Sequence, residues 1–411
     1  MKIDKIKISG YKNLDGVEFE LKNFNVLIGS NNSGKSNFLE IFSFLKKVIY
    51  GSDKEKLSIF NGVSDRGRII TNCKNVKKNE TSISIEYSDL VEEEEYKYVY
   101  ELVINYSDVF SVDELQEFDY IKKERFQYKK MNNTGPLREL FVRNNKDIDF
   151  KWKSMNKLKK IDAKECVISI LNKLLDFKQG LDKEVIQGIN DIELICDTQV
   201  LYSNSEEIRN SMNIGLAKSD KNSIIRNGRI IALNVMEYID KILKSDMKDM
   251  YKDILLDTLE ITNIEPMRFT IAKEQEGAIL LVLVKLANGQ TMDLTQMSDG
   301  TLMVLNIITY LISNEYPILA IEELENSIHP KLLKKMVELI KNTFSDKQII
   351  ITTHSPVLLN MVEIKDVSII HKNEKGISTI DSVTKDKKLL QQITGPFSDP
   401  SDIFYIDNYE K

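Results

Sequence analysis

The sequence has few cysteines, and they do not form a recognisable metal-binding pattern. Cys73, Cys166 and Cys196 are its three cysteines; they lie far apart in a chain of 411 residues and match no zinc-ligand spacing. So few cysteines give no disulfide framework either. With no signal peptide at the N-terminus, we expect a protein of the reducing cytoplasm.

Long apolar runs, internal repeats and low-complexity linkers are also missing. No stretch approaches the length of a membrane span, so we expect no transmembrane helix. The net charge of −6 does not predict nucleic-acid binding, although a local basic patch could still provide it. With 42% hydrophobic and 29% charged residues, the composition is that of a globular chain of two or three domains.

The strongest motif lies in residues 25–38, which read NVLIGSNNSGKSNF and contain the phosphate-loop pattern G-x-x-x-x-G-K-[ST]. An apolar run at 24–28 precedes it as a strand, and an apolar-periodic helix follows. Glycines let backbone N–H groups turn towards a phosphate, Lys35 would reach the β- and γ-phosphates of ATP, and Ser36 would bind Mg²⁺. The alternative is a turn that is merely rich in Gly, Ser and Asn. The residues assigned to nucleotide binding here are Gly29, Ser30, Asn31, Asn32, Ser33, Gly34, Lys35, Ser36 and Asn37.

Two carboxylates follow a second apolar strand at 318–321. A carboxylate pair at the C-terminal end of a strand suits the ligand crevice of an open α/β sheet. Glu322 would hold Mg²⁺ through water, and Glu323 would polarise the attacking water as the general base. An acidic surface loop is the alternative.

Two further positions could contact phosphate. His354 follows the strand 348–352 and would sense the γ-phosphate or orient water, although a lone histidine is more often structural. Ser298, Asp299 and Gly300 open a helix and could form a second anion site, or could simply cap that helix. Two phosphate sites in one chain suggest a head-to-tail dimer in which each nucleotide lies between two subunits.

The pattern of strands and helices predicts an α/β chain interrupted by a largely helical insert. Residues 158–177 and 230–259 are the clearest helices of that insert. The acidic run 92–95 is predicted to be a hairpin tip, with a metal site as the alternative. The predicted segments are 1–106 (first half of an ATPase lobe), 107–262 (insert), 263–385 (second half) and 386–411 (tail).

Two basic clusters within the insert have two interpretations, a nucleic-acid surface or a solvated helix face, and we favour the second. The first cluster contains Lys122, Lys123, Arg125, Lys129 and Lys130. The second contains Lys151, Lys153, Lys157, Lys159 and Lys160.

The motifs GSNNSGKS, MSDGT, IEELENSIHP and ITTHSP, in that order, resemble ABC-type ATPases of the RecF/SMC/OLD group, and most closely the OLD-like "AAA family" ATPases of prokaryotic defence operons. The resemblance covers residues 1–106 and 263–385 and implies an ABC-type P-loop ATPase head with ATP and Mg²⁺ as ligands. It also implies that Ser298 and Gly300 act in trans as the signature loop, that 325–329 lies at a dimer interface, and that His354 is the switch histidine. Glu322 stands where the group usually has aspartate.

The resemblance implies a regulatory ATPase of anti-phage defence that controls a partner. Only 57 residues follow His354, fewer than the roughly 100 of a nuclease domain, so we expect a nuclease or toxin effector on another chain. The alternatives are a RecF-like DNA-repair ATPase that binds duplex DNA, and a nucleotide-gated scaffold with little turnover.

Overall fold

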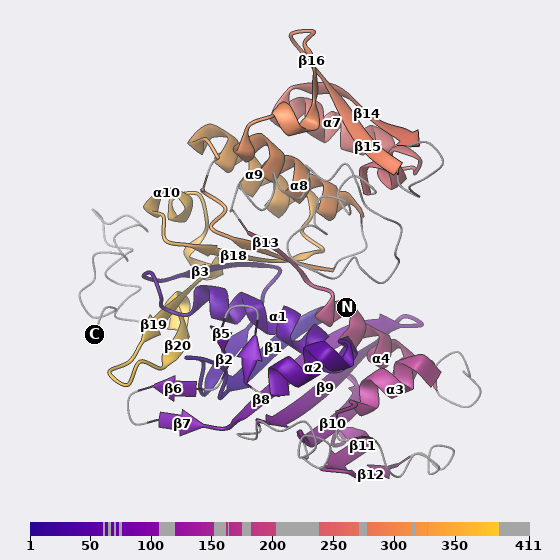
Figure 1. The fold of residues 1–411 in the computed structure, drawn as a ribbon, viewed down its shortest axis with the longest axis vertical. Helices are drawn as coiled ribbons and strands as arrows, with labels where there is room; N and C mark the ends of the chain where they lie inside the picture. The colour runs from indigo at the N-terminus through magenta and orange to yellow at the C-terminus, as the bar shows by residue number, and fades with distance from the viewer. Residues whose placement is uncertain are drawn as a thin grey trace. The chain divides into compact units, whose positions relative to one another are not determined.

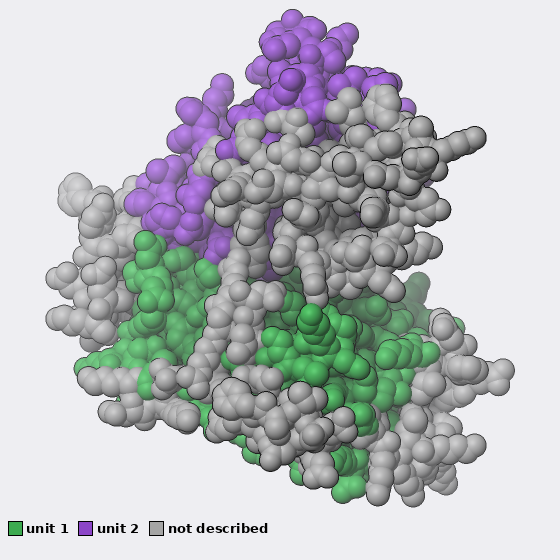
Figure 2. Space-filling view, in the orientation of Figure 1, with its two compact units in different colours: residues 1–198, 364–411 green, residues 199–363 purple. Residues whose placement is uncertain are grey.

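The computed structural model describes most of the chain, and the described residues form two units. One unit contains 1–198 and 364–411, and the other contains 199–363 (Figure 2). The described residues are 1–60, 62–64, 67–69, 71–73, 76–106, 120–151, 162, 164–174, 182–202, 238–270, 278–313, 317–326 and 328–385.

A long hairpin stands at the centre of the first unit. β8 (Glu80–Val91) and β9 (Glu94–Asn105) pair antiparallel, and apolar residues such as Ile83 and Ile85 alternate onto the buried face. Glu92 and Glu93 have φ values of 50° and 69°, the left-handed conformation of a two-residue hairpin turn. The acidic run is therefore a hairpin tip, as predicted.

The hairpin belongs to a seven-stranded antiparallel sheet in the order β12-β11-β10-β9-β8-β1-β2. Its other strands are β1 (Lys2–Ser9), β2 (Val17–Glu20), β10 (Ile121–Lys130), β11 (Arg138–Asn144) and β12 (Asp147–Phe150).

The strands between 121 and 150 correct the prediction of a largely helical insert in this part of the chain. The dense Lys and Glu residues of 121–130 look like a helix surface in the sequence. Pairing with β9 decides otherwise, because it buries Phe126 and Tyr128 on the inner face of the sheet. The first basic cluster accordingly lies on a strand and not on a helix.

Four helices cover the inner face of this sheet (Figure 1). They are α1 (Lys35–Tyr50), α2 (Asp53–Phe60), α3 (Val167–Leu174) and α4 (Lys183–Cys196). At Gly188 in α4, a Cβ atom would lie 2.4 Å from the Tyr98 ring, so glycine permits the close approach of helix and sheet. The short pairs β4 (Val63–Ser64) with β5 (Gly67–Arg68), and β6 (Thr71–Cys73) with β7 (Val76–Lys78), complete this part.

A buried polar cluster ties α3 to the sheet. The Glu124 carboxylate on β10 accepts hydrogen bonds from the N–H groups of Val167 and Ile168 at the start of α3. Burial raises the pKa of Glu124, and the nearby Arg143 guanidinium opposes that rise. Arg143 donates to the backbone carbonyls of Asp162 and Glu165. The described residues between 120 and 198 thus pack as part of the first unit.

A second group of strands in the first unit contains the strand that leads into the phosphate loop. β3 (Phe24–Ile28) is buried along its length and runs parallel to β19 (Val367–Lys372). β19 pairs antiparallel with β20 (Ser378–Ser382), and Gly376 at the turn has a φ of 77°. This confirms the hairpin predicted near residues 372–376, and it places a late segment of the chain beside β3.

Among its described residues, the second unit contains three parallel strands and a separate antiparallel sheet of three strands. β13 (Gln199–Tyr202), β17 (Ile318–Glu322) and β18 (Gln348–Thr353) are parallel, so their C-terminal ends meet at one edge. Besides the helical residues 238–243, the described α-helices of this unit are α7 (Lys248–Leu259), α8 (Asp299–Ser313), α9 (Pro330–Thr343) and α10 (Pro356–Leu359). β14 (Ile261–Thr270), β15 (Ala278–Leu286) and β16 (Thr291–Asp293) form a separate antiparallel sheet.

The helix predicted over 230–259 is interrupted in its described part. Residues 238–243 are helical, and α7 begins only at Lys248. Ser245 lies in the break, where its Oγ donates to the Ile242 carbonyl and accepts from the Met247 N–H. Serine side chains compete with helical hydrogen bonds in this way. The tail 386–411 and the second basic cluster beyond Lys151 lie outside the described residues, and the predicted four-segment division stays a prediction.

Candidate nucleotide site

The phosphate loop connects β3 to α1 with the backbone geometry that its glycines permit. Gly34 has a φ of 113°, and Asn32 has a φ of 67°. A Cβ at Gly29 would lie 2.3 Å from the Ile370 carbonyl oxygen, and one at Gly34 would lie 2.7 Å from Ser378 Oγ. Glycine is therefore required at both positions, by close packing and, at Gly34, also by backbone conformation.

The loop and the start of α1 suit an anion. Lys35 is buried, and its Nζ donates to the carbonyls of Gly29 at 2.7 Å and Ser30 at 3.0 Å. α1 begins at Lys35 with no side-chain cap and no acidic residue in its first turn, so its positive dipole end faces the loop unopposed. Ser33 Oγ is buried and has no hydrogen-bond partner within the part of the chain that the structure describes. These donors fit the phosphates of a nucleotide.

The carboxylate pair lies at the end of β17, as predicted. Glu322 is the last residue of that strand, and Glu323 has a φ of 51°, in the left-handed region that β strands exclude. The Glu323 N–H donates to the Thr352 carbonyl of β18 at 2.8 Å, and the Glu323 Oε2 accepts from Asn326 Nδ2 at 2.6 Å. The turn directs the Glu323 side chain towards the end of the neighbouring strand.

His354 meets this carboxylate directly. Its Nδ1 lies 3.1 Å from Glu323 Oε1, and the two side chains are 43% and 27% exposed, so they contact each other and still reach solvent. The sequence predicted both residues separately, and the structure brings them together. A carboxylate held by a histidine and an asparagine can accept a proton from water and share its charge with the imidazole.

Glu325 was not predicted as a site residue, yet it supports His354. Its Oε1 accepts from Thr353 Oγ1 at 2.6 Å and from the His354 N–H at 3.3 Å, and its side chain is only 9% exposed. Its Oε2 has no hydrogen-bond partner among the described residues. Sequence spacing gave no signal for this contact, since β17 and β18 become neighbours only in the folded sheet.

Ser298 caps α8, as one of the predicted alternatives holds. Its Oγ accepts from the Thr301 N–H at 3.3 Å, and the helix begins at Asp299. Ser298 is exposed and Gly300 is buried. A role of this helix start on a nucleotide of another subunit remains a prediction.

The two predicted Mg²⁺ ligands both supply oxygen atoms. Ser36 lies in the first turn of α1, and Glu322 is a half-buried carboxylate at the end of β17. A hydroxyl and a carboxylate are each oxygen ligands of the kind that Mg²⁺ prefers, and that these two hold one ion remains a prediction. The described residues contain no group of three or more His, Cys, Asp or Glu that could hold a metal.

The first basic cluster is largely neutralised by neighbouring carboxylates. Lys122 pairs with Glu80 at 2.6 Å, and Lys123 pairs with Glu101 at 3.0 Å. Arg125 pairs with Glu139 at 2.5 Å. These partners on neighbouring strands compensate the positive charge that a nucleic-acid surface needs.

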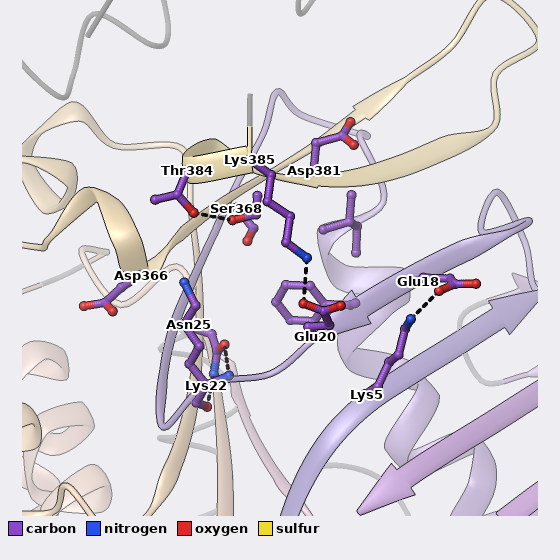
Figure 3. Close-up of a pocket in the computed structure, with 13 residues that line it drawn as sticks. Lys5, Glu18, Glu20, Lys22, Asn25, Asp366, Ser368, Asp381, Thr384 and Lys385 are labelled. Atoms are coloured by element: carbon purple, nitrogen blue, oxygen red, sulfur yellow. Dashed lines mark hydrogen bonds and ion pairs between the residues drawn. The ribbon is translucent and has the colours of Figure 1, made fainter. Parts of the chain in front are cut away.

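The first unit also contains a cavity of about 660 Å³, seen in Figure 3. Its lining includes Lys22 and Asn25 at the start of β3, so it lies at the opposite end of that strand from the phosphate loop. Within it, Lys5 pairs with Glu18 at 2.5 Å. The cavity is therefore separate from the nucleotide site.

One known protein family matches the part of the sequence that contains most of these residues. The family described as "AAA domain, putative AbiEii toxin, Type IV TA system" matches residues 24–360, from β3 to beyond His354. The chain belongs to this family. This AAA-domain chain is also 24% identical over 430 residues to "Retron Vc95 probable ATPase" of Vibrio cholerae serotype O1 biovar El Tor, which covers 97% of this chain and 77% of that protein.

The fold of the AAA-domain chain is that of SMC heads. The structure described as "Crystal structure of the SmcHead bound to the C-winged helix domain of ScpA" matches with a TM-score of 0.51 and 14% identity, over 94% of this chain and 100% of that one. The predicted fold of an ABC-type head is thus confirmed, and the family match makes the chain an AAA-domain protein. In the part of the chain that the structure describes, none of the helices could span a lipid bilayer.

Proposed function

We propose that the chain binds and hydrolyses ATP, and that ATP-driven association of two heads controls a separate effector in prokaryotic anti-phage defence. The observation that carries the proposal is the contact of Glu323 with His354, in a chain that also has the phosphate-loop motif before α1. A phosphate loop alone supports binding, whereas a held carboxylate and an imidazole add a means of activating water.

The proposed roles follow from the chemistry of each group. Lys35 and the N–H groups of the loop hold the phosphates. Ser36 and Glu322 hold Mg²⁺, which supplies charge neutralisation at the phosphates. Glu323 takes a proton from the attacking water, and His354 contacts the γ-phosphate.

The proposed dimer and the proposed separate effector are inferred from the resemblance to the RecF/SMC/OLD group. Ser298, Asp299 and Gly300 would approach the γ-phosphate bound by another subunit, and ADP, which lacks that phosphate, would not close the pair. The similarity to a retron ATPase supports a setting in phage defence. Co-purification with a nuclease or toxin encoded nearby would support the effector, whereas ATPase stimulation by duplex DNA would favour the RecF-like alternative.

Calorimetry with Mg²⁺ and ATP tests the central part of the proposal. Lys35→Ala should abolish tight binding, because Lys35 is the cation assigned to the phosphates. Lys46→Ala is the matched control, since Lys46 lies on the same helix but is exposed and pairs with Asp197 at 2.6 Å. Wild-type affinity in Lys35→Ala would refute the phosphate-loop assignment.

A further inference from the structure

The rear of the phosphate loop is held by two polar residues from distant parts of the chain. Asn13 follows β1, and Ser378 is the first residue of β20. Asn13 is 9% exposed and Ser378 is 0% exposed, so both are buried. The Ser378 N–H also donates to the Asn13 carbonyl at 2.8 Å, which fixes the two residues to each other.

The Asn13 amide uses all of its hydrogen-bonding groups except one acceptor position. Its Nδ2 donates to Ser378 Oγ at 2.6 Å and to the Ser33 carbonyl oxygen at 3.4 Å. Its Oδ1 accepts from Asn37 Nδ2, in the first turn of α1, at 2.7 Å. One side chain therefore links the loop, the helix that follows it and the C-terminal hairpin.

The Ser33 carbonyl is the point where these contacts converge. Ser378 Oγ donates to it while accepting from Asn13, so two donors hold one oxygen. The C=O and N–H groups of a planar trans peptide point in opposite directions. With the Ser33 oxygen held towards Asn13 and Ser378, the Gly34 N–H in the same peptide plane points away from them.

We propose that Asn13 and Ser378 are positioning residues for ATP, which hold the Ser33–Gly34 peptide so that the Gly34 N–H faces the phosphates. The inference rests on the proposed ATP binding and deepens it. The two residues also pack closely against Gly34, because a Cβ there would lie 2.7 Å from Ser378 Oγ and 3.0 Å from Asn13 Nδ2. The hairpin β19–β20 is thereby a structural part of the phosphate site, although Ser378 and Ser33 lie 345 positions apart in the chain.

Isosteric substitutions test the proposal with little change in packing. Asn13→Asp replaces the amide donor by an oxygen and draws the Ser378 hydroxyl away from the Ser33 carbonyl. Ser378→Ala removes that hydroxyl. Each should weaken ATP binding by about tenfold, the effect of losing one or two buried hydrogen bonds. The double variant should bind ATP at most about threefold more weakly than the more impaired of the two single variants, because both residues hold the same carbonyl.

Kinetics separate positioning from general loosening of the fold. The KM for ATP should rise about tenfold while kcat stays within about threefold, since the proposed base is on a different element. Ser382→Ala is the control: it lies on the same strand, and its Oγ contacts only Thr384 at 3.1 Å among the described hydrogen bonds. Ser378→Thr retains the hydroxyl and should restore affinity, which a purely steric defect would not.

The outcomes distinguish this inference from the proposed function. If Lys35→Ala abolishes binding but Asn13→Asp and Ser378→Ala bind ATP as the wild type does, only the positioning role is refuted. If Lys35→Ala also binds as the wild type does, both proposals fall. If Ser378→Ala does not fold, Asn13→Asp still decides, and a normal KM in that folded variant overturns the inference.

Discussion

Replacing Glu323 by glutamine should stop ATP turnover and leave ATP binding intact. One carboxylate oxygen of Glu323 lies 3.1 Å from His354 Nδ1, and the other accepts from Asn326 Nδ2 at 2.6 Å. Glutamine has the same length, and its amide oxygen can still accept from Asn326, so the turn after β17 should keep its shape. The substitution removes only the negative charge that would receive the proton of water. A positioned general base contributes about 10²–10⁴-fold in rate, or ~3–5 kcal/mol of activation free energy.

The assay is phosphate release at saturating Mg²⁺ and ATP, with ATP affinity measured in parallel by calorimetry. Glu338→Gln is the matched control, because this carboxylate on α9 is 59% exposed and lies 4.0 Å from Lys334. We expect the control to turn over normally and Glu323→Gln to lose at least about 100-fold in kcat, with affinity changed by less than about threefold. Turnover close to that of the wild type would refute the reasoning and move the base to Glu322 or His354.

Three further predictions concern the second subunit, the support of His354 and the pH dependence of stability. A Lys35→Ala chain mixed with a Ser298→Arg chain should regain part of the ATPase activity that each lacks alone, since one composite site then has both halves intact. Verified mixed dimers that bind nucleotide at the intact site but show no rescue of activity would contradict the arrangement in trans. Glu325→Ala should lower kcat by about tenfold and Glu325→Gln should restore most of it, because the amide oxygen can still accept from the residues at the end of β18; equal kcat in all three proteins would exclude the supporting role. Burial, and then the nearby Asp89, raise the pKa of Asp191 to about 7, so the folded state binds more protons than the unfolded one and the free energy of unfolding should fall as pH rises from about 4 to about 7. In urea unfolding, Asp191→Asn should be more stable than the wild type by about 2–4 kcal/mol near pH 8 and by less near pH 5. The opposite trend would refute the assignment.

Local patterns were sufficient wherever neighbouring residues decide the structure. The phosphate loop, the strand ending in Glu322, the turn at 92–93 and the start of α8 depend on glycines, apolar runs and helix caps that lie close together in the sequence. The phosphate loop could be predicted from sequence because such a loop needs particular residue types at fixed spacing. The same reasoning failed over 121–130, where the composition resembles a helix surface and the pairing partner β9 decides the strand.

The amino-acid sequence by itself determined the family motifs, the residues of the phosphate loop and the acidic and histidine candidates. Only the tertiary structure decided which of these side chains meet. Parallel pairing of β17 with β18 places Glu323 and Glu325 against His354, and the β19–β20 hairpin brings Ser378 to the Ser33 carbonyl. Such contacts join residues tens to hundreds of positions apart, and they form because burying the strands' apolar faces fixes their order and register. No local spacing rule encodes that register, which is why the supporting residues became visible only in the folded chain.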